Sequence, residues 1–185
     1  MTNLKKQKVT EEEAPQGINV QNCGFNNVVI SWNSLKSINL GCLRLTEDDM
    51  VKLLSSCPVL ETMELYRYIG FRRLEINSLK LKTLKLKDYV QMGGNGDDLE
   101  ILSPYIQHLE ISGEDLKCRL VNVSYVVNAK LIYSFACIKG LPSTYMEDDC
   151  HAYHQVVYTL VQDNLQKLCY ATDLTIGTWF KHVCL

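Results

Sequence analysis

The side chains best suited to chemistry lie close together at Asp148, Asp149, Cys150, His151 and His154. A thiol beside two imidazoles is able to bind a metal, or Cys150 could act as a nucleophile with His154 as its base. However, no second ligand pair with zinc-like spacing occurs elsewhere, and catalytic pairs usually come from distant parts of a chain. We therefore predict no metal, no cofactor and no catalytic residue, and keep a cysteine-dependent hydrolase as an alternative function.

Composition argues against several other classes. The chain has 185 residues, a net charge of −2, 46% apolar residues and 22% charged residues, which is typical of a folded domain. It has no basic stripe for nucleic acid, no apolar run of about 18 residues for a membrane, and no G-K-S/T after the glycines at 93–96. Eight scattered cysteines without a C-x-x-C pair or a secretory signal favour a reduced cytoplasmic or nuclear location.

A repeated pattern indicates how the chain is organised. The form L-x-x-L-x-L begins at Leu35, Leu60, Leu81, Ile106 and, more weakly, Val126, which are spaced by 25, 21, 25 and 20 residues. This period is typical of leucine-rich repeats. Each copy predicts one short strand with its apolar side chains in a shared core, so we expect strands of successive copies to lie side by side.

Other segments complete the predicted coils. Residues 71–76 repeat the strand pattern only 11 residues after Leu60, too soon for a parallel neighbour in the same sheet, so we place them on the convex side. Residues 116–123 have the same relation to Ile106 and Val126. Thr46 and Asp49 predict a capping box before a helix that ends at Cys57.

These patterns predict the fold class and the domain division. The fold is α/β: a leucine-rich-repeat solenoid with a parallel concave sheet and irregular convex strands and helices. Residues 1–15 form a disordered tail and residues 16–185 form the repeat domain. Residues 18–23 begin it as the end of an early repeat, a helix covers about 149–170, and a last strand follows at 174–176.

The concave face is the expected binding surface, because repeat proteins of this kind bind through it. Its central row is Asn39, Glu64, Lys85, Glu110, Lys130 and Thr175. The four middle residues alternate in charge, so they form either a self-neutralised surface or a recognition strip for a charged peptide. Beside them we place Tyr66, Tyr68, Lys87, Tyr89 and His108, where the tyrosines either anchor a partner or only cover the turn.

The sequence also resembles a known family. Residues 31–37 (SWNSLKS) and 57–61 (CPVLE), with 118–124 (CRLVNVS) and 174–179 (LTIGTW), look like the plant F-box proteins with leucine-rich repeats. The resemblance covers roughly residues 20–180. In that family, an N-terminal F-box docks on the adaptor of an SCF ubiquitin ligase, and the repeats select the protein to be ubiquitinated.

The resemblance implies a protein-binding domain, not an enzyme, that corresponds to the substrate-recognition part of such a protein. An F-box needs about forty residues, which residues 1–15 cannot hold, so we expect no contact with the ligase adaptor. The expected partner is a protein on the concave face, with no nucleic acid and no membrane. A truncated, non-functional paralogue is the alternative to a working recognition domain.

Overall fold

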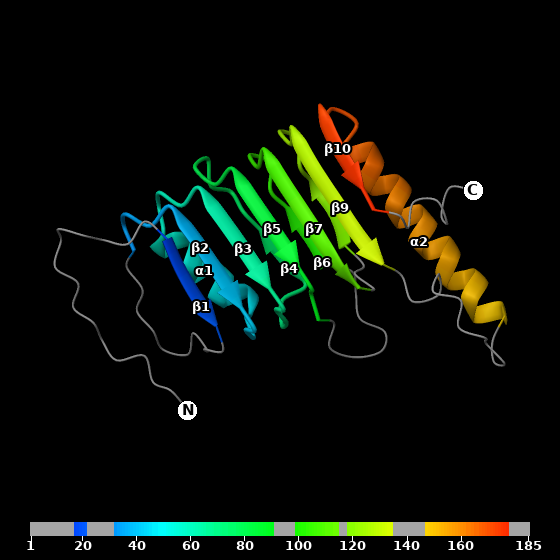
Figure 1. Cartoon of the computed structure of the whole chain (residues 1–185), viewed down its shortest axis with the longest axis horizontal. Helices are drawn as coiled ribbons and strands as arrows, with labels where there is room; N and C mark the ends of the chain where they lie inside the picture. The colour runs from blue at the N-terminus through cyan, green and yellow to red at the C-terminus, as the bar shows by residue number, and fades with distance from the viewer. Residues whose placement is uncertain (1–16, 22–31, 91–98, 115–117, 135–146, 178–185) are drawn as a thin grey trace.

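The structure is a computed structural model that describes residues 17–21, 32–90, 99–114, 118–134 and 147–177. The predicted tail at 1–15 lies outside these residues. Figure 1 shows seven strands side by side, running in sequence order from β1 at one end to β10 at the other. The order is β1-β2-β3-β5-β7-β9-β10, and every neighbouring pair is parallel. These strands are β1 (Gly17–Gln21), β2 (Ser37–Gly41), β3 (Thr62–Tyr66), β5 (Thr83–Lys87), β7 (His108–Glu114), β9 (Asn128–Ser134) and β10 (Asp173–Ile176).

The predicted repeat register is confirmed along the whole sheet. The second apolar position of each copy pairs with its equivalent in the next: Ile38 with Met63, Met63 with Leu84, and Leu84 with Leu109. The early repeat is also present, because Val20 of β1 pairs with Leu40. The apolar positions are fully buried and alternate with partly exposed ones, since successive strand residues point to opposite faces.

A second, smaller sheet lies behind the first. It contains β4 (Arg73–Glu75), β6 (Leu99–Leu102) and β8 (Cys118–Asn122), all parallel. The placement of 71–76 and 116–123 away from the main sheet is therefore confirmed. The strand β6 was not predicted, because the sequence pattern indicated no element in the residues between the glycines at 93–96 and Ile106.

Two helices complete the described fold. In α1 (Glu47–Ser56), the Thr46 hydroxyl accepts a hydrogen bond from the Asp49 N–H at 3.2 Å, and the Asp49 carboxylate accepts one from the Thr46 N–H at 3.0 Å. This is the predicted capping box, a feature worth about 1 kcal/mol. The helix ends before Cys57, where Pro58 disfavours helical geometry, as predicted.

The long helix α2 (Glu147–Lys167) packs against β8 at the end of the smaller sheet. It begins two residues before and ends three residues before the predicted range. Val157, Leu160, Val161 and Leu168 of the predicted apolar stripe are buried. The chain then turns back and adds β10 to the main sheet beside β9.

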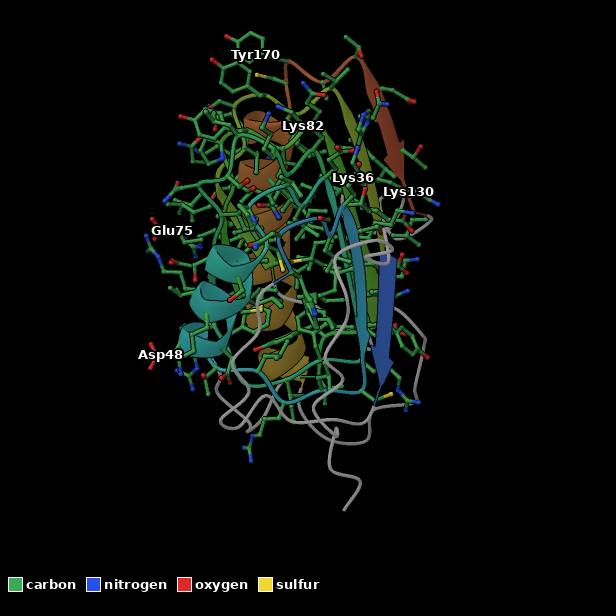
Figure 2. All side chains as sticks on the ribbon, turned by 90° about the vertical axis from the view of Figure 1, so that its left-hand side faces the viewer. Lys36, Asp48, Glu75, Lys82, Lys130 and Tyr170 are labelled. Carbon is green, nitrogen blue, oxygen red and sulfur yellow. The ribbon has the colours of Figure 1, made fainter. Side chains whose placement is uncertain are left out.

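The core lies between the two layers. Figure 2 shows Lys36 and Lys130 on the side of the main sheet, and Asp48 and Glu75 on the opposite side. The side chains between the layers form one continuous apolar cluster. The residues facing away from this cluster on the main sheet form what we call the polar face.

The chain leaves three successive strands through a left-handed residue. Cys42, Arg67 and Asp88 follow β2, β3 and β5 with φ of 55°, 48° and 51°. The N–H of each donates to a carbonyl of the neighbouring strand at 2.9–3.0 Å. This hydrogen bond helps to compensate for a conformation that disfavours side chains other than glycine. The left-handed conformation interrupts the alternation of inward and outward side chains at these three residues.

Candidate functional site

The polar face contains the predicted central row in register. Adjacent Cα partners link Asn39 to Glu64, Glu64 to Lys85, and onward through the rest of the row. We call this set the polar row: Asn39, Glu64, Lys85, Glu110, Lys130 and Thr175. Its members are half-buried or exposed, so they are accessible to a partner.

The charges of the polar row pair in an unexpected way. Lys87, which lies two residues beyond Lys85 on β5, places its Nζ 2.8 Å from Glu64 Oε1 and 3.9 Å from Glu110 Oε1. The lysine thus joins carboxylates of the strands on both sides of its own. Its hydrogen bond to Glu64 raises the pKa of Lys87, against the opposing effect of partial burial. The middle of the polar face is therefore neutralised mainly by Lys87, which lies beside the polar row and not within it.

Lys85 is left without this compensation. Within the described residues, Lys85 makes no ion pair, whereas the two flanking carboxylates, Glu64 and Glu110, contact Lys87. Lys130 has only a distant contact, 3.9 Å, with Glu110. The polar face therefore changes in character along the sheet, from a close ion pair between β3 and β5 to distant contacts of 3.9 Å at β7 and β9.

A hollow of about 200 Å³ lies in this second part of the polar face. We call it the C-terminal hollow. It spans β5, β7, β9 and β10, and Asn128 Nδ2 lies 3.2 Å from His108 Nδ1 on its floor. Its lining combines opposite charges with neutral polar groups: Thr83, Lys85, His108, Leu109, Glu110, Asn128, Ala129, Lys130, Asp173 and Thr175.

The predicted tyrosine patch is divided by the structure. Placing Tyr68 beside the polar row was wrong, because its side chain is only 1% exposed. Its ring stacks on Phe71 at 5.3 Å, and Tyr89 contacts both rings and donates a hydrogen bond to the Phe71 carbonyl at 3.1 Å. Burial raises the pKa of Tyr89. Tyr68 therefore presents no surface to a partner, and Tyr89 is largely a core residue.

Tyr68 and Tyr89 are turned inward by the left-handed residues that follow β3 and β5. A strand continued through Arg67 would place Tyr66 and Tyr68 on one face, as the period of two predicts. The left-handed φ of Arg67 instead turns the chain, so that Tyr66 stays outside and Tyr68 enters the core. Asp88 has the same effect on Tyr89.

The other predicted site residues do lie on the polar face. Glu64, Lys85, Lys87, Glu110 and Tyr66 have partly or well exposed side chains, and Tyr66 is 38% exposed. His108 lines the C-terminal hollow. The structure thus places six of the eight predicted residues on the polar face, whereas Tyr68 and Tyr89 pack into the core.

Several lining residues of the hollow were missed from the sequence, among them Asn128 and Asp173. Asn128 and Asp173 occupy the position of His108 on the next two strands. The signal was present, because both stand one residue before the second apolar position of their copies, as His108 does before Leu109. The weakness of these two copies, with Ala129 at the second position of one and Ala171 at the first position of the other, concealed the equivalence.

The cysteine and histidine cluster remains untested. Residues 150–154 belong to α2, but their side chains lie outside the described part of the structure. Among the residues whose side chains are described, no group of three or more His, Cys, Asp or Glu is arranged to hold a metal ion. Neither of the two described helices is long and apolar enough to cross a membrane.

Parallel strands that recur with the L-x-x-L-x-L pattern and share one core define an α/β repeat fold of the leucine-rich-repeat class. The chain belongs to the family of leucine-rich-repeat domains of FBD-associated F-box proteins, because the family model described as "FBD-associated F-box protein At5g56370, LRR repeats" matches residues 18–124. The resemblance inferred from the sequence is therefore confirmed.

Curated relatives from Arabidopsis thaliana agree with this assignment. The chain is 30% identical to the probable F-box protein At1g60180 over 121 residues, 64% of this chain and 37% of that protein. It is 28% identical to the F-box/LRR-repeat protein At3g03360, over 82% of this chain and 29% of that protein. It is 31% identical to the putative F-box/LRR-repeat protein At3g18150, over 80% and 30%. The chain thus spans little more than a third of these relatives at most, and no solved structure matches it.

Proposed function

We propose that this chain is a protein-binding repeat domain that corresponds to the substrate-recognition part of an SCF-type F-box protein. In this proposal the repeats form a solenoid, the polar face is its concave surface, and that surface binds the target protein. The domain acts in the cytoplasm or nucleus and catalyses no reaction itself. Membership in the F-box/leucine-rich-repeat family supports the substrate-recognition role.

The observation that carries the proposal is the unequal distribution of charge on the polar face. A surface that only needed to stay in water would gain little from uncompensated charges beside a hollow. Here Lys85 makes no ion pair among the described residues, and it lines a hollow with Asn128 and Asp173. Partly buried polar groups without full pairing are suited to bonds with an incoming partner.

The experiment that tests the proposal is a gain of function. The full chain is fused to the F-box segment of the relative At3g03360 and expressed in Arabidopsis cells, and protein half-lives are measured across the proteome. We expect a small set of proteins whose half-lives fall at least twofold and which bind the purified chain directly. The matched variant, which we call the folded control because it should fold but not bind, carries Asn39→Arg, Tyr66→Ala and Thr175→Arg. All three changes lie on the polar face.

The control distinguishes binding through this face from other effects. The three changes leave the buried apolar positions intact, so the variant should unfold near the temperature of the original. It should also lose both direct binding and accelerated turnover. Equal turnover with the original chain and with the folded control would refute a role for the polar face, and absence of any destabilised protein would refute the recognition function.

A further inference from the structure

The C-terminal hollow has opposite uncompensated charges at its two ends. Lys85 lies on β5 at one end, and Asp173 lies on β10 at the other. Neither side chain makes an ion pair within the described part of the chain. Between them stand the neutral amide of Asn128 and the imidazole of His108, with Lys130 and Glu110 forming a distant pair at 3.9 Å.

The sheet geometry sets the distance between these two ends. Three strand intervals separate β5 from β10 in the order β5-β7-β9-β10. With strands about 4.8 Å apart, the interval across the sheet is about 14 Å. Asp173 is in register with Thr83, two residues before Lys85, so the two charged positions are also offset by about 7 Å along the strands and lie about 16 Å apart. An extended peptide advances about 3.4 Å per residue, so four residues cover about 14 Å, and the reach of the long charged side chains covers the rest. Side chains at i and i+4 point to the same side.

We propose that the C-terminal hollow binds an extended peptide segment that crosses the strands and carries an acidic and a basic side chain four residues apart. The acidic side chain pairs with Lys85 and the basic one with Asp173. Asn128 and His108 offer hydrogen bonds to the peptide between the two charges. This inference rests on the proposed function and specifies the chemistry of the partner.

Peptides of defined spacing test this inference directly. Twelve-residue peptides of serine, threonine and valine carry one Glu and one Lys at i,i+4 or at i,i+3, in both orders. Their affinities for the full chain are measured by NMR titration at low ionic strength. We expect one i,i+4 order to bind at least fivefold tighter than either i,i+3 peptide, because i,i+3 side chains of an extended segment point to opposite sides. Equal affinities for i,i+3 and i,i+4 would overturn the inference.

Charge reversal in the protein assigns the two ends. Lys85→Glu should weaken binding of the preferred peptide about fivefold or more, and replacing the peptide's Glu with Lys should restore it. Asp173→Lys should respond in the same way to replacement of the peptide's Lys by Glu. The controls Lys52→Glu on α1 and Asp163→Lys on α2 change exposed charges away from the polar face and should have no effect. Loss of affinity without restoration by the swapped peptide would contradict the assignment.

The result can be separated from a failure of the proposed function. Suppose that neither spacing nor charge reversal affects peptide binding, while the Asn39→Arg, Tyr66→Ala, Thr175→Arg variant still loses its degradation targets. The inference about the hollow then fails and the recognition function stands. If that variant keeps all its targets as well, the inference about the hollow and the role of the polar face both fail, and only the recognition function itself stands.

Discussion

The side-chain oxygen of Asn164 on α2 accepts a hydrogen bond from the Leu120 N–H of β8 at 2.8 Å. The amide nitrogen of the same side chain donates to the Cys118 carbonyl of that strand at 2.6 Å. Asn164 is only 2% exposed. A single buried side chain thus makes the donor and acceptor contacts that a further parallel strand would make with β8, and α2 closes the smaller sheet at this edge.

Replacement of Asn164 should therefore be strongly destabilising. In Asn164→Leu, the Leu120 N–H and the Cys118 carbonyl lose their hydrogen bonds to Asn164 in a buried environment, and a buried group left unsatisfied costs about 1–3 kcal/mol. We expect a loss of about 2–4 kcal/mol in the free energy of unfolding, measured by urea denaturation. The matched control is Gln162→Ala, because Gln162 is exposed and bonds only within α2. A loss below about 0.5 kcal/mol for Asn164→Leu would contradict the role assigned to this side chain.

The bridge made by Lys87 should contribute modest stability that depends on pH. Lys87→Met removes a half-buried cation that joins Glu64 and Glu110, and we expect a loss of about 0.5–1 kcal/mol at pH 7 and low salt. The folded-state pKa of Lys87 is raised above its ordinary value, about 10.4 in the unfolded chain. The contribution is therefore complete below about pH 10 and is lost as the pH rises through the folded pKa.

This pH dependence is checked by urea denaturation of the original chain and of Lys87→Met from pH 7 to 11.5, and again in 1 M salt. The measured quantity is the difference between their unfolding free energies. It should shrink above about pH 10.4 and in high salt. Lys36→Met is the control, because Lys36 and Glu61 form a pair with both side chains more than half exposed. A Lys87 effect no larger than the Lys36 effect would contradict the bridge as a stabilising element.

Gly70 is required by a close approach of two backbone segments. Its φ is +110°, and a Cβ at this position would overlap the carbonyl oxygen of Leu45. The two segments are held together by hydrogen bonds from the Leu45 N–H to the Ile69 carbonyl at 2.8 Å and from the Ile69 N–H to the Leu43 carbonyl at 3.0 Å. We expect Gly70→Ala to lower the free energy of unfolding by about 1–3 kcal/mol.

Arg67→Gly provides the opposite comparison in the same denaturation experiment. Glycine relieves the left-handed φ of 48° at this position but increases the entropy of the unfolded chain. These effects offset, so the stability should change by less than about 0.5 kcal/mol. Equal destabilisation by both substitutions would show that backbone conformation does not explain the requirement for Gly70.

Thiol reactivity should separate the described cysteines into two groups. Cys42 and Cys169 are exposed, whereas Cys57 is buried, and this burial raises the pKa of Cys57 to about 11. At pH 8 only about a thousandth of Cys57 is thiolate, and the thiolate is the form that reacts. Iodoacetamide should modify Cys42 and Cys169 first, and Cys57 only after unfolding, as followed by peptide mass spectrometry.

The same measurement tests the alternative enzyme function. If Cys150 serves as a nucleophile, it should react much faster than Cys42, because an activated cysteine has a lowered pKa. If the chain is a binding domain, Cys150 should react no faster than Cys42. Rapid modification of Cys57 in the folded protein would instead contradict the burial of the first group.

The sequence by itself determined the strand register and the family. Each repeat must bury the same apolar positions, so the spacing of Leu35, Leu60, Leu81 and Ile106 was sufficient to align their strands, and it placed the polar row correctly. The helix α1 was also readable, since its capping box involves only residues three apart. These features depend on local periodicity, which a sequence carries explicitly.

Only the tertiary structure decided which polar residues compensate one another. A left-handed turn at Arg67 or Asp88 is not marked by glycine, so the burial of Tyr68 and Tyr89 was hidden. The bridging position of Lys87 and the contact of Asn164 with β8 depend on side-chain reach between elements that are distant in the chain. Such choices follow from three-dimensional geometry, because a charge or amide in the sequence does not specify which of several neighbours it will meet.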